Sequence, residues 1–200
     1  MLLDVTDSQL VLVDYQTRLM PVIFEGAAVT QRAVLLGQAA KLLRVPVWGT
    51  EQNPLKLGPN APEIQALCDQ TLSKMHFGAC QPNLLDVLRP APTPPSGNSR
   101  SLPKHLQKNK PAAPERNTIV VAGCETHVCL LQTALGLLEE EFDVWVVTDA
   151  CSSRRERDRD AAFDRLAGNG AELVTSEMVM FEWMRTCEHP QFRDVLTLLK

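Results

Sequence analysis

Two polar segments each come directly after a short run of apolar residues. Asp14 follows residues 9–13 (QLVLV), and residues 123–129 (GCETHVC) follow residues 118–122 (TIVVA). In open parallel sheets ligands bind at the carboxyl ends of the strands, so both segments are candidates for a functional site. A carboxylate can take up a proton, and a cysteine can attack a carbonyl carbon. The sequence therefore indicates acid–base and nucleophilic chemistry at one edge of a sheet.

Cys129 falls in the first turn of a helix that the apolar spacing predicts over residues 126–140. The free N–H groups at a helix N-terminus lower the pKa of a thiol and can stabilise an oxyanion. Glu125 or Thr126 could cap this helix. An isolated cysteine at a helix start is nevertheless more often a small buried apolar residue than a nucleophile. Assigning Cys129 as a nucleophile therefore depends on its partners.

The elements needed to position these residues alternate along the chain. Helical spacing over residues 27–43 connects the apolar run 9–13 to a second run at 45–50 (VPVWGT). A connection of that length favours parallel pairing through a crossover helix, because a hairpin could not contain it. The order predicts an α/β fold, and the pattern returns as strand, helix, strand, helix and strand at residues 118–122, 126–140, 143–147, 161–166 and 172–174.

Composition limits the classes of function. With 200 residues, 44% of them hydrophobic, the chain can bury one substantial core, so we expect one domain over residues 1–200. A net charge of −4 gives no electrostatic reason to expect nucleic acid or an anionic membrane as a partner. No apolar run approaches the roughly 20 residues that span a bilayer. A small-molecule substrate or a protein partner fits better.

The cysteines and the start of the chain favour a cytoplasmic location. The six cysteines lack the spacing of a metal site or of a disulfide-rich scaffold. Residues 1–9 lack a basic segment followed by an apolar one, which a secretory leader would have. Both features favour reduced thiols in the cytoplasm.

Two further segments carry structural expectations. Residues 90–116 are rich in Pro, Ser, Asn and Lys and have little apolar surface with which to offset their ordering entropy, so we expect a surface loop with solvated charges. The final residues, 190–200, place Phe192, Val195 and Leu199 at helical spacing. This predicts a terminal helix that packs on the domain or on a neighbouring subunit.

Three motifs resemble those of the isochorismatase-like cysteine hydrolases. They are residues 14–16 (DYQ), 73–79 (SKMHFGA) and 123–129 (GCETHVC), and their order and separation match the family pattern. The resemblance covers residues 6–181 apart from the proline-rich segment. It implies a three-layer α/β/α, Rossmann-like fold with a mostly parallel six-stranded sheet.

The resemblance also implies the roles of individual residues. Asp14, Lys74 and Cys129 match the catalytic triad of the family. Asp14 would take the thiol proton, Lys74 would hold the developing negative charge, and Cys129 would attack an amide-like carbonyl to give a thioester that water hydrolyses. The family places a cis peptide bond shortly before the cysteine, here Cys124–Glu125. The backbone N–H groups of Glu125 and Cys129 would form the oxyanion hole.

The chain departs from two branches of this family. Residues 50–54 (TEQNP) stand where nicotinamidase-like members have an Asp and His cluster, so we expect no metal, no other cofactor and no nicotinamidase activity. True isochorismatases lack the nucleophilic cysteine, whereas Cys129 is present here. The chain instead resembles metal-free members without an assigned substrate. The cysteine favours hydrolysis of a C–N bond or a related acyl transfer.

Four further residues lie within or near the three motifs. Gln52 and Phe77 are candidates for lining the substrate pocket, where aromatic and polar side chains orient a ligand. His76 and His127 flank the proposed site. Because His127 lies two residues before Cys129 on a helical turn, it faces elsewhere, and we expect a structural role for both histidines.

Two alternatives to an active hydrolase are open. One is a non-catalytic relative that uses the fold as a protein-binding or scaffolding module. The other is a redox-sensitive thiol at Cys129, although no second cysteine lies at CxxC spacing and Cys124 is five residues away. Members of the family commonly form homo-oligomers, and we expect one here.

Overall fold

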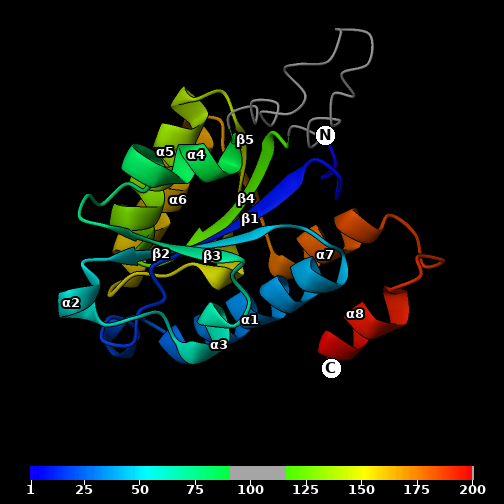
Figure 1. Cartoon of the computed structure of the whole chain (residues 1–200), viewed down its shortest axis with the longest axis horizontal. Helices are drawn as coiled ribbons and strands as arrows, with labels where there is room; N and C mark the ends of the chain where they lie inside the picture. Colours follow the sequence, from blue (N-terminus) through cyan, green and yellow to red (C-terminus); the bar gives the residue numbers. More distant parts are fainter. Residues whose placement is uncertain (91–115, 200) are drawn as a thin grey trace, which may run out of the picture.

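A six-stranded sheet runs through the centre of the computed structural model, which describes residues 1–90 and 116–199 (Figure 1). The strand order is β3-β2-β1-β4-β5-β6, and every neighbouring pair is parallel. The expected Rossmann-like sheet is therefore confirmed. The strands are β1 (Ser8–Val13), β2 (Val47–Gln52), β3 (Gln70–Lys74), β4 (Thr118–Gly123), β5 (Asp143–Val147) and β6 (Glu172–Val174).

The central strands are apolar because helices cover both faces of the sheet. All six residues of β1 and all six of β4 are buried, as expected for parallel strands inside an α/β protein. Figure 1 shows three layers. One face carries α1 (Gly26–Leu42), α3 (Pro62–Gln65), α7 (Ser176–Met184) and α8 (Phe192–Leu198); the other carries α4 (Leu85–Leu88), α5 (Leu131–Glu139) and α6 (Glu156–Gly168).

The chain reverses its direction of winding between β1 and β4. From β1 it proceeds outward to β2 and β3, whereas from β4 it proceeds the other way to β5 and β6. Ligands of open α/β sheets bind at such a switch point, outside the carboxyl ends of the strands. Val13 pairs with Thr50 on one side and with Gly123 on the other. The residues that follow these three positions therefore meet at one edge of the sheet.

Gly123 allows β4 to end against β1. A Cβ atom at this position would overlap the carbonyl oxygen and the side chain of Val13. Cys124 then donates its backbone N–H to the Val13 carbonyl at 3.0 Å. A larger residue at Gly123 would push apart the two strand ends that carry the polar segments.

The structure corrects or completes several expectations. The helix expected over residues 126–140 begins with a π-helical turn, η4 (Thr126–Leu130), before α5. The terminal helix is confirmed as α8, whose Val195 packs against Met180 and Met184. Within the proline-rich segment expected at 90–116, residues 91–115 lie outside the described part of the chain. In that described part, no helix is both long enough and apolar enough to cross a membrane.

Candidate active site

Asp14 directly follows β1 and is fully buried. Its backbone has a φ of 55°, the left-handed region that Asp tolerates better than most residues. Thr50 donates its hydroxyl to Oδ1 at 2.7 Å, and Lys74 donates its ammonium to Oδ2 at 2.6 Å. Both carboxylate oxygens are therefore engaged. The contact of Thr50 was not predicted, although the place of this residue in β2 beside the end of β1 could have indicated it.

Lys74 is the last residue of β3, and its side chain is buried rather than solvated. Besides Asp14, its ammonium donates to the carbonyl oxygen of Phe77 at 2.8 Å and more weakly to that of His76 at 3.4 Å. Burying an ammonium is costly unless it is paired and hydrogen-bonded. The loop after β3 therefore folds back so that its carbonyl groups hold the lysine against Asp14.

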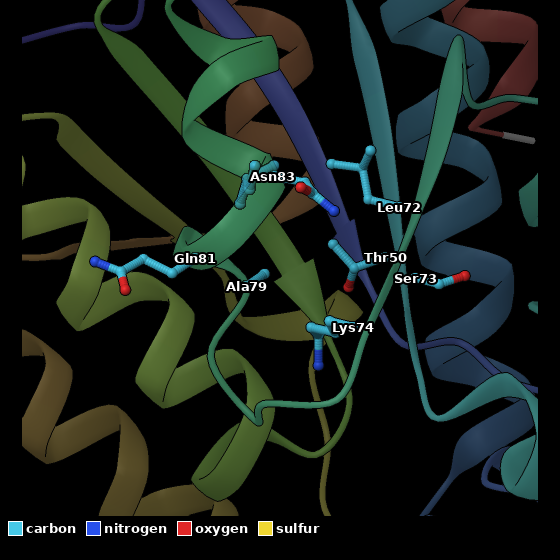
Figure 2. A pocket seen from close by; sticks show the side chains of 8 residues that line it. Thr50, Leu72, Ser73, Lys74, Ala79, Gln81 and Asn83 are labelled. Atoms are coloured by element: carbon cyan, nitrogen blue, oxygen red, sulfur yellow. The ribbon is translucent and has the colours of Figure 1, made fainter.

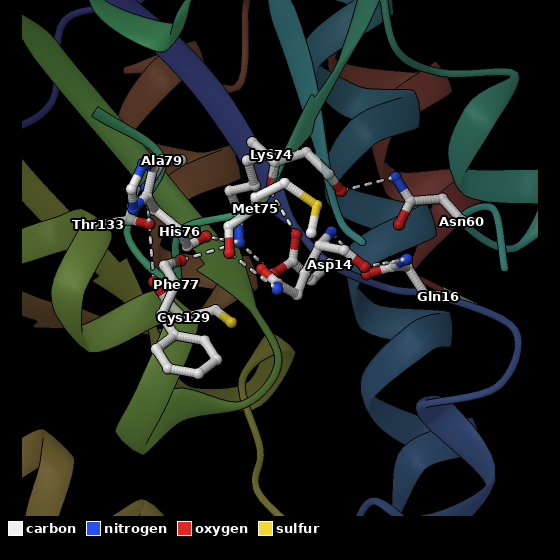
Figure 3. Close-up of polar contacts among 12 residues, drawn as sticks. Asp14, Gln16, Asn60, Lys74, Met75, His76, Phe77, Ala79, Cys129 and Thr133 are labelled. Atoms are coloured by element: carbon white, nitrogen blue, oxygen red, sulfur yellow. Dashed lines mark hydrogen bonds and ion pairs between the residues drawn. The ribbon is translucent and has the colours of Figure 1, made fainter. Parts of the chain in front are cut away.

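Cys129 lies in the η4 turn and is buried beside this ion pair. Figure 3 shows its sulfur next to the Lys74 ammonium and the Phe77 ring. Burial raises the pKa of the Cys129 thiol to about 12, the Asp14 carboxylate acts in the same direction, and Lys74 partly opposes them. The position of Cys129 at a helix start predicted instead a lowered pKa for this thiol. Desolvation outweighs that effect and favours the protonated thiol.

The segment before Cys129 has the backbone geometry that the resemblance implied. The Cys124–Glu125 peptide bond is cis. The Glu125 carboxylate accepts the backbone N–H of Arg154 at 3.1 Å and its Nε–H at 2.8 Å. Thr126 donates its backbone N–H to the Ser152 carbonyl at 2.9 Å. The end of β4 is thereby tied to residues that follow β5.

The expected side-chain cap of this helix is wrong. Glu125 occupies the N-cap position without a side-chain cap hydrogen bond. The Thr126 hydroxyl is buried without a hydrogen-bond partner among the described residues. The first turn is π-helical rather than α-helical, so the spacing of an α-helical capping motif does not apply to it.

Gln16 fixes the end of β2 onto the end of β1. Its side-chain amide donates to the Gln52 carbonyl at 3.0 Å and to the Gly58 carbonyl at 2.6 Å. Its Oε1 accepts the backbone N–H of Gln52 at 2.8 Å. The amide thus continues the contact between the two chain segments beyond Val13 and Thr50, the last pair of the β1–β2 ladder. The DYQ motif contained this residue, but the motif alone did not indicate its task.

The two expected pocket residues differ in their relation to the loop after Lys74, residues 75–79, which we call the lysine loop: Phe77 belongs to it, and Gln52 contacts it. The Gln52 side chain donates to the Met75 carbonyl at 3.2 Å, which ties β2 to this loop. The Phe77 side chain is 53% exposed and the Met75 side chain 69% exposed, so both present apolar surface to solvent. In the view of Figure 3 the Phe77 ring is drawn close to the Cys129 side chain. Of the two expected residues, Phe77 has its side chain at the mouth of the site.

A small cavity lies behind the ion pair (Figure 2). It has a volume of about 10 Å³ and is lined in part by Thr50, Lys74, Ala79 and Asn83. That volume is close to the least that can hold one water molecule. This cavity is too small for a substrate, so an approach from the side of Met75 and Phe77 fits the site better.

The two histidines make contacts of their own. Nδ1 of His127 lies 2.9 Å from the Ser153 hydroxyl, and the backbone carbonyl of His76 accepts the Lys74 ammonium at 3.4 Å. Within residues 1–90 and 116–199, no group of three or more His, Cys, Asp and Glu side chains is arranged to hold a metal ion. Glu51, in the segment where a metal site would stand, instead accepts the Asn60 backbone N–H at 2.8 Å.

Comparison with known proteins identifies relatives over most of the chain. A family model described as the isochorismatase domain matches residues 8–178. Isochorismatase domain-containing protein 2 of Bos taurus is 36% identical over 193 residues, covering 96% of this chain and 83% of the relative. The protein of the same name from Homo sapiens is 32% identical over 193 residues, with 96% and 83% covered.

Solved structures have the same fold. A protein described as the MAR1 ribonuclease of Caenorhabditis elegans aligns with a TM-score of 0.84 at 29% identity, over 100% of this chain and 92% of that one. The YcaC gene product of Escherichia coli aligns with a TM-score of 0.75 at 26% identity, over 98% and 95%. That protein is described as an octameric hydrolase of unknown specificity.

Proposed function

The chain belongs to the isochorismatase family of hydrolases, and from that premise we propose that it is a cysteine hydrolase of small amides or related acyl compounds. The observation that carries the proposal is the buried Asp14–Lys74 ion pair beside the Cys129 thiol. A protonated thiol needs a base, and an anion formed in a buried site needs a cation. In this proposal Asp14 is the base and Lys74 is the cation.

In the first half of the proposed reaction, the Cys129 sulfur attacks the substrate carbonyl carbon while its proton passes to the Asp14 carboxylate. The carbonyl oxygen becomes an oxyanion, which the backbone N–H groups of Glu125 and Cys129 would receive. When the C–N bond breaks, the leaving amine takes the proton from Asp14. The product of this half is an acyl thioester on Cys129.

In the second half, a water molecule attacks the thioester carbonyl and gives its proton to Asp14. The C–S bond breaks, the acid leaves, and the proton returns to the Cys129 sulfur. Lys74 keeps its charge throughout, and its ammonium stabilises the negative charge that passes between the sulfur, the carboxylate and the acyl oxygen. The raised pKa of the thiol fits this scheme, because a base within the site makes a free thiolate unnecessary.

We propose Gln52 and Phe77 as substrate-binding residues and a homo-oligomer as the working form. Phe77 offers an exposed ring at the mouth of the site, and Gln52 holds the loop that carries it. For the oligomer, the support is the Escherichia coli relative, which is described as octameric. Light scattering on the purified chain tests the assembly, and a monomer at micromolar concentration would contradict it.

RNA is not the substrate that we propose, although the Caenorhabditis elegans relative is described as a ribonuclease. Proteins that bind nucleic acid neutralise phosphates with clustered Lys and Arg, whereas this chain has a net charge of −4. A short RNA added to the substrate panel tests this point directly. Its cleavage in a manner dependent on Cys129 would require a different reaction scheme.

The test of the proposed function is acyl-enzyme formation. With p-nitrophenyl acetate as a probe, we expect a burst of p-nitrophenolate and an acetyl group on the peptide that contains Cys129, removed by hydroxylamine as thioesters are. Cys129→Ala abolishes both, and Asp14→Asn slows the burst about 100- to 10,000-fold, the usual contribution of a general base. A panel of small primary amides, with ammonia release as the readout, then identifies the acyl group.

Cys187→Ala provides the matched control, because Cys187 is an exposed free cysteine outside the site. It should leave the burst unchanged. Acetylation spread over several residues, or a burst that survives Cys129→Ala, would contradict a cysteine hydrolase. The scaffolding alternative would then become the better explanation.

A further inference from the structure

We propose that Thr133 is a positioning residue that couples the lysine loop to the helix of the nucleophile, an inference that rests on the proposed function. Its hydroxyl donates to the Cys129 carbonyl at 2.7 Å and accepts the Ala79 backbone N–H at 3.1 Å. Thr133 is fully buried. One hydroxyl group therefore joins the backbone at Cys129 to the end of the loop that follows Lys74.

The loop packs closely on α5 around this hydroxyl. Cys80 donates its thiol to the Thr133 carbonyl at 3.4 Å. A Cβ atom at Gly136 would lie 2.8 Å from the Cys80 sulfur, and one at Gly78 would lie 3.4 Å from the Gln132 Cβ. Gly136 therefore allows the close approach of loop and helix, whereas the distance at Gly78 is an ordinary van der Waals contact. Thr133 therefore lies at a closely packed contact between this loop and α5.

The hydrogen bond at Ala79 is connected to Lys74 through the backbone between Phe77 and Ala79. Phe77 precedes Ala79 by two positions, and its carbonyl accepts the Lys74 ammonium at 2.8 Å. A shift of Ala79 would therefore move an acceptor that holds the ammonium in place. Asp14 and Lys74 are the charged groups that act on the Cys129 thiol, and of these two only Lys74 favours its ionised form. Thr133 accordingly sets how strongly Lys74 acts on the sulfur.

The residue type suits this task. A hydroxyl can donate and accept at once, which a single bridging side chain between a carbonyl and an N–H group requires. Valine has nearly the same shape and neither capacity, whereas serine retains both. The two substitutions therefore separate the hydrogen bonds of Thr133 from its packing.

The experiment compares the alkylation of Cys129 by iodoacetamide in wild type, Thr133→Val and Thr133→Ser between pH 7 and 9, with each modified site located by mass spectrometry. We expect Thr133→Val to lower the alkylation rate of Cys129 about tenfold at each pH, the change that a rise of about one unit in its pKa would give. Thr133→Ser should stay within about twofold of wild type. Thermal unfolding of each variant shows that it is folded at the assay temperature.

Thr30→Val is the matched control. Thr30 donates its hydroxyl to the carbonyl four residues earlier, Gly26, at 2.8 Å in α1, the same helix bond outside the site. It should leave the alkylation of Cys129 unchanged. Equal profiles for Thr133→Val and wild type, or equal losses in Thr133→Val and Thr133→Ser, would overturn the coupling.

Lys74→Met separates the failure of this inference from that of the proposed function. If Lys74→Met slows alkylation and Thr133→Val does not, only the coupling fails. If neither Lys74→Met nor Asp14→Asn changes the reactivity of Cys129 in otherwise folded protein, both the coupling and the proposed function fail.

Discussion

The Lys74 ammonium lies 2.6 Å from the Asp14 Oδ2, and the two side chains are only 4% and 0% exposed. The desolvation of such a pair offsets much of its Coulomb attraction, so a buried ion pair adds little stability compared with apolar residues of the same size. Removing one partner is different, because the other charge remains buried and unpaired. The pair is therefore better explained by what it does to Cys129 than by what it adds to the fold.

This asymmetry predicts the stability of three variants. Asp14→Asn and Lys74→Met should each lower the free energy of unfolding by about 3–5 kcal/mol, the usual cost of breaking a buried pair. The double variant should be more stable than the sum of the single losses implies, because neither charge remains. Urea unfolding of all four proteins measures the coupling energy. Additive losses would show that the two groups do not interact in the folded protein.

The buried thiols predict a loss of stability at alkaline pH. Burial is the largest cause that raises the pKa of Cys80, Cys124 and Cys129 from the ordinary value of 9.0 to about 12 in each case. A raised pKa means that the folded state keeps the proton while the unfolded chain loses it. The contribution is complete below pH 9 and declines as the pH rises toward 12.

Cys129→Ala tests that decline at a single thiol. Between pH 8 and 10 each such thiol should cost about 1.4 kcal/mol of unfolding free energy, the equivalent of one pKa unit. In Cys129→Ala the fall between pH 8 and 10 should be smaller by about that amount than in wild type. An equally steep fall in the variant would show that Cys129 ionises as easily in the folded protein as in the unfolded chain.

The fold followed from local patterns to a large extent. The apolar runs at residues 118–122, 143–147 and 172–174 and the helical spacing at 27–43 each correspond to an element of the sheet or its covering helices. A strand buried on both faces leaves a continuous apolar run, and a crossover helix leaves a period near 3.6, so both can be recognised without tertiary information. The end of β1 placed Asp14 at the edge of the sheet for the same reason.

Tertiary contacts account for what the sequence did not reveal. The direction of the pKa shift at Cys129 depends on how completely the thiol is desolvated, which a position at the start of a helix does not determine. Thr50 and Thr133 are common residue types whose hydroxyls acquire their roles through partners 36 and 54 residues away, Asp14 and Ala79. No local spacing encodes those distances.

Gln16 holds the end of β2 through an uncharged side chain, and its replacement predicts a loss of stability. Gln16→Met keeps the length of the side chain but leaves the Gln52 N–H and two carbonyl groups without their partner. We expect a loss of about 1–3 kcal/mol in unfolding free energy, the usual penalty for a buried polar group left unsatisfied. Gln65→Met, which removes only a 3.2 Å side-chain contact to Glu51, is the control and should cost less. Equal losses in the two variants would show that the hydrogen bonds of Gln16 to β2 contribute no more to the unfolding free energy than the contact of Gln65.

A substitution at Phe77 can distinguish substrate binding from the chemical step. Phe77 contacts Lys74 through its backbone carbonyl, which a substitution retains, and the residue is 53% exposed. Phe77→Ala should therefore leave acylation of Cys129 by p-nitrophenyl acetate within about twofold of wild type. For p-nitrophenyl butyrate, whose longer acyl chain can pack on the ring, KM should rise by about three- to tenfold, the scale expected from about one buried methylene. Met178→Ala, which truncates another exposed apolar residue on α7, is the control for general surface effects. A similar fall in acylation with both esters would place Phe77 in the chemistry of the site, and no change with either would remove it from the substrate-binding surface.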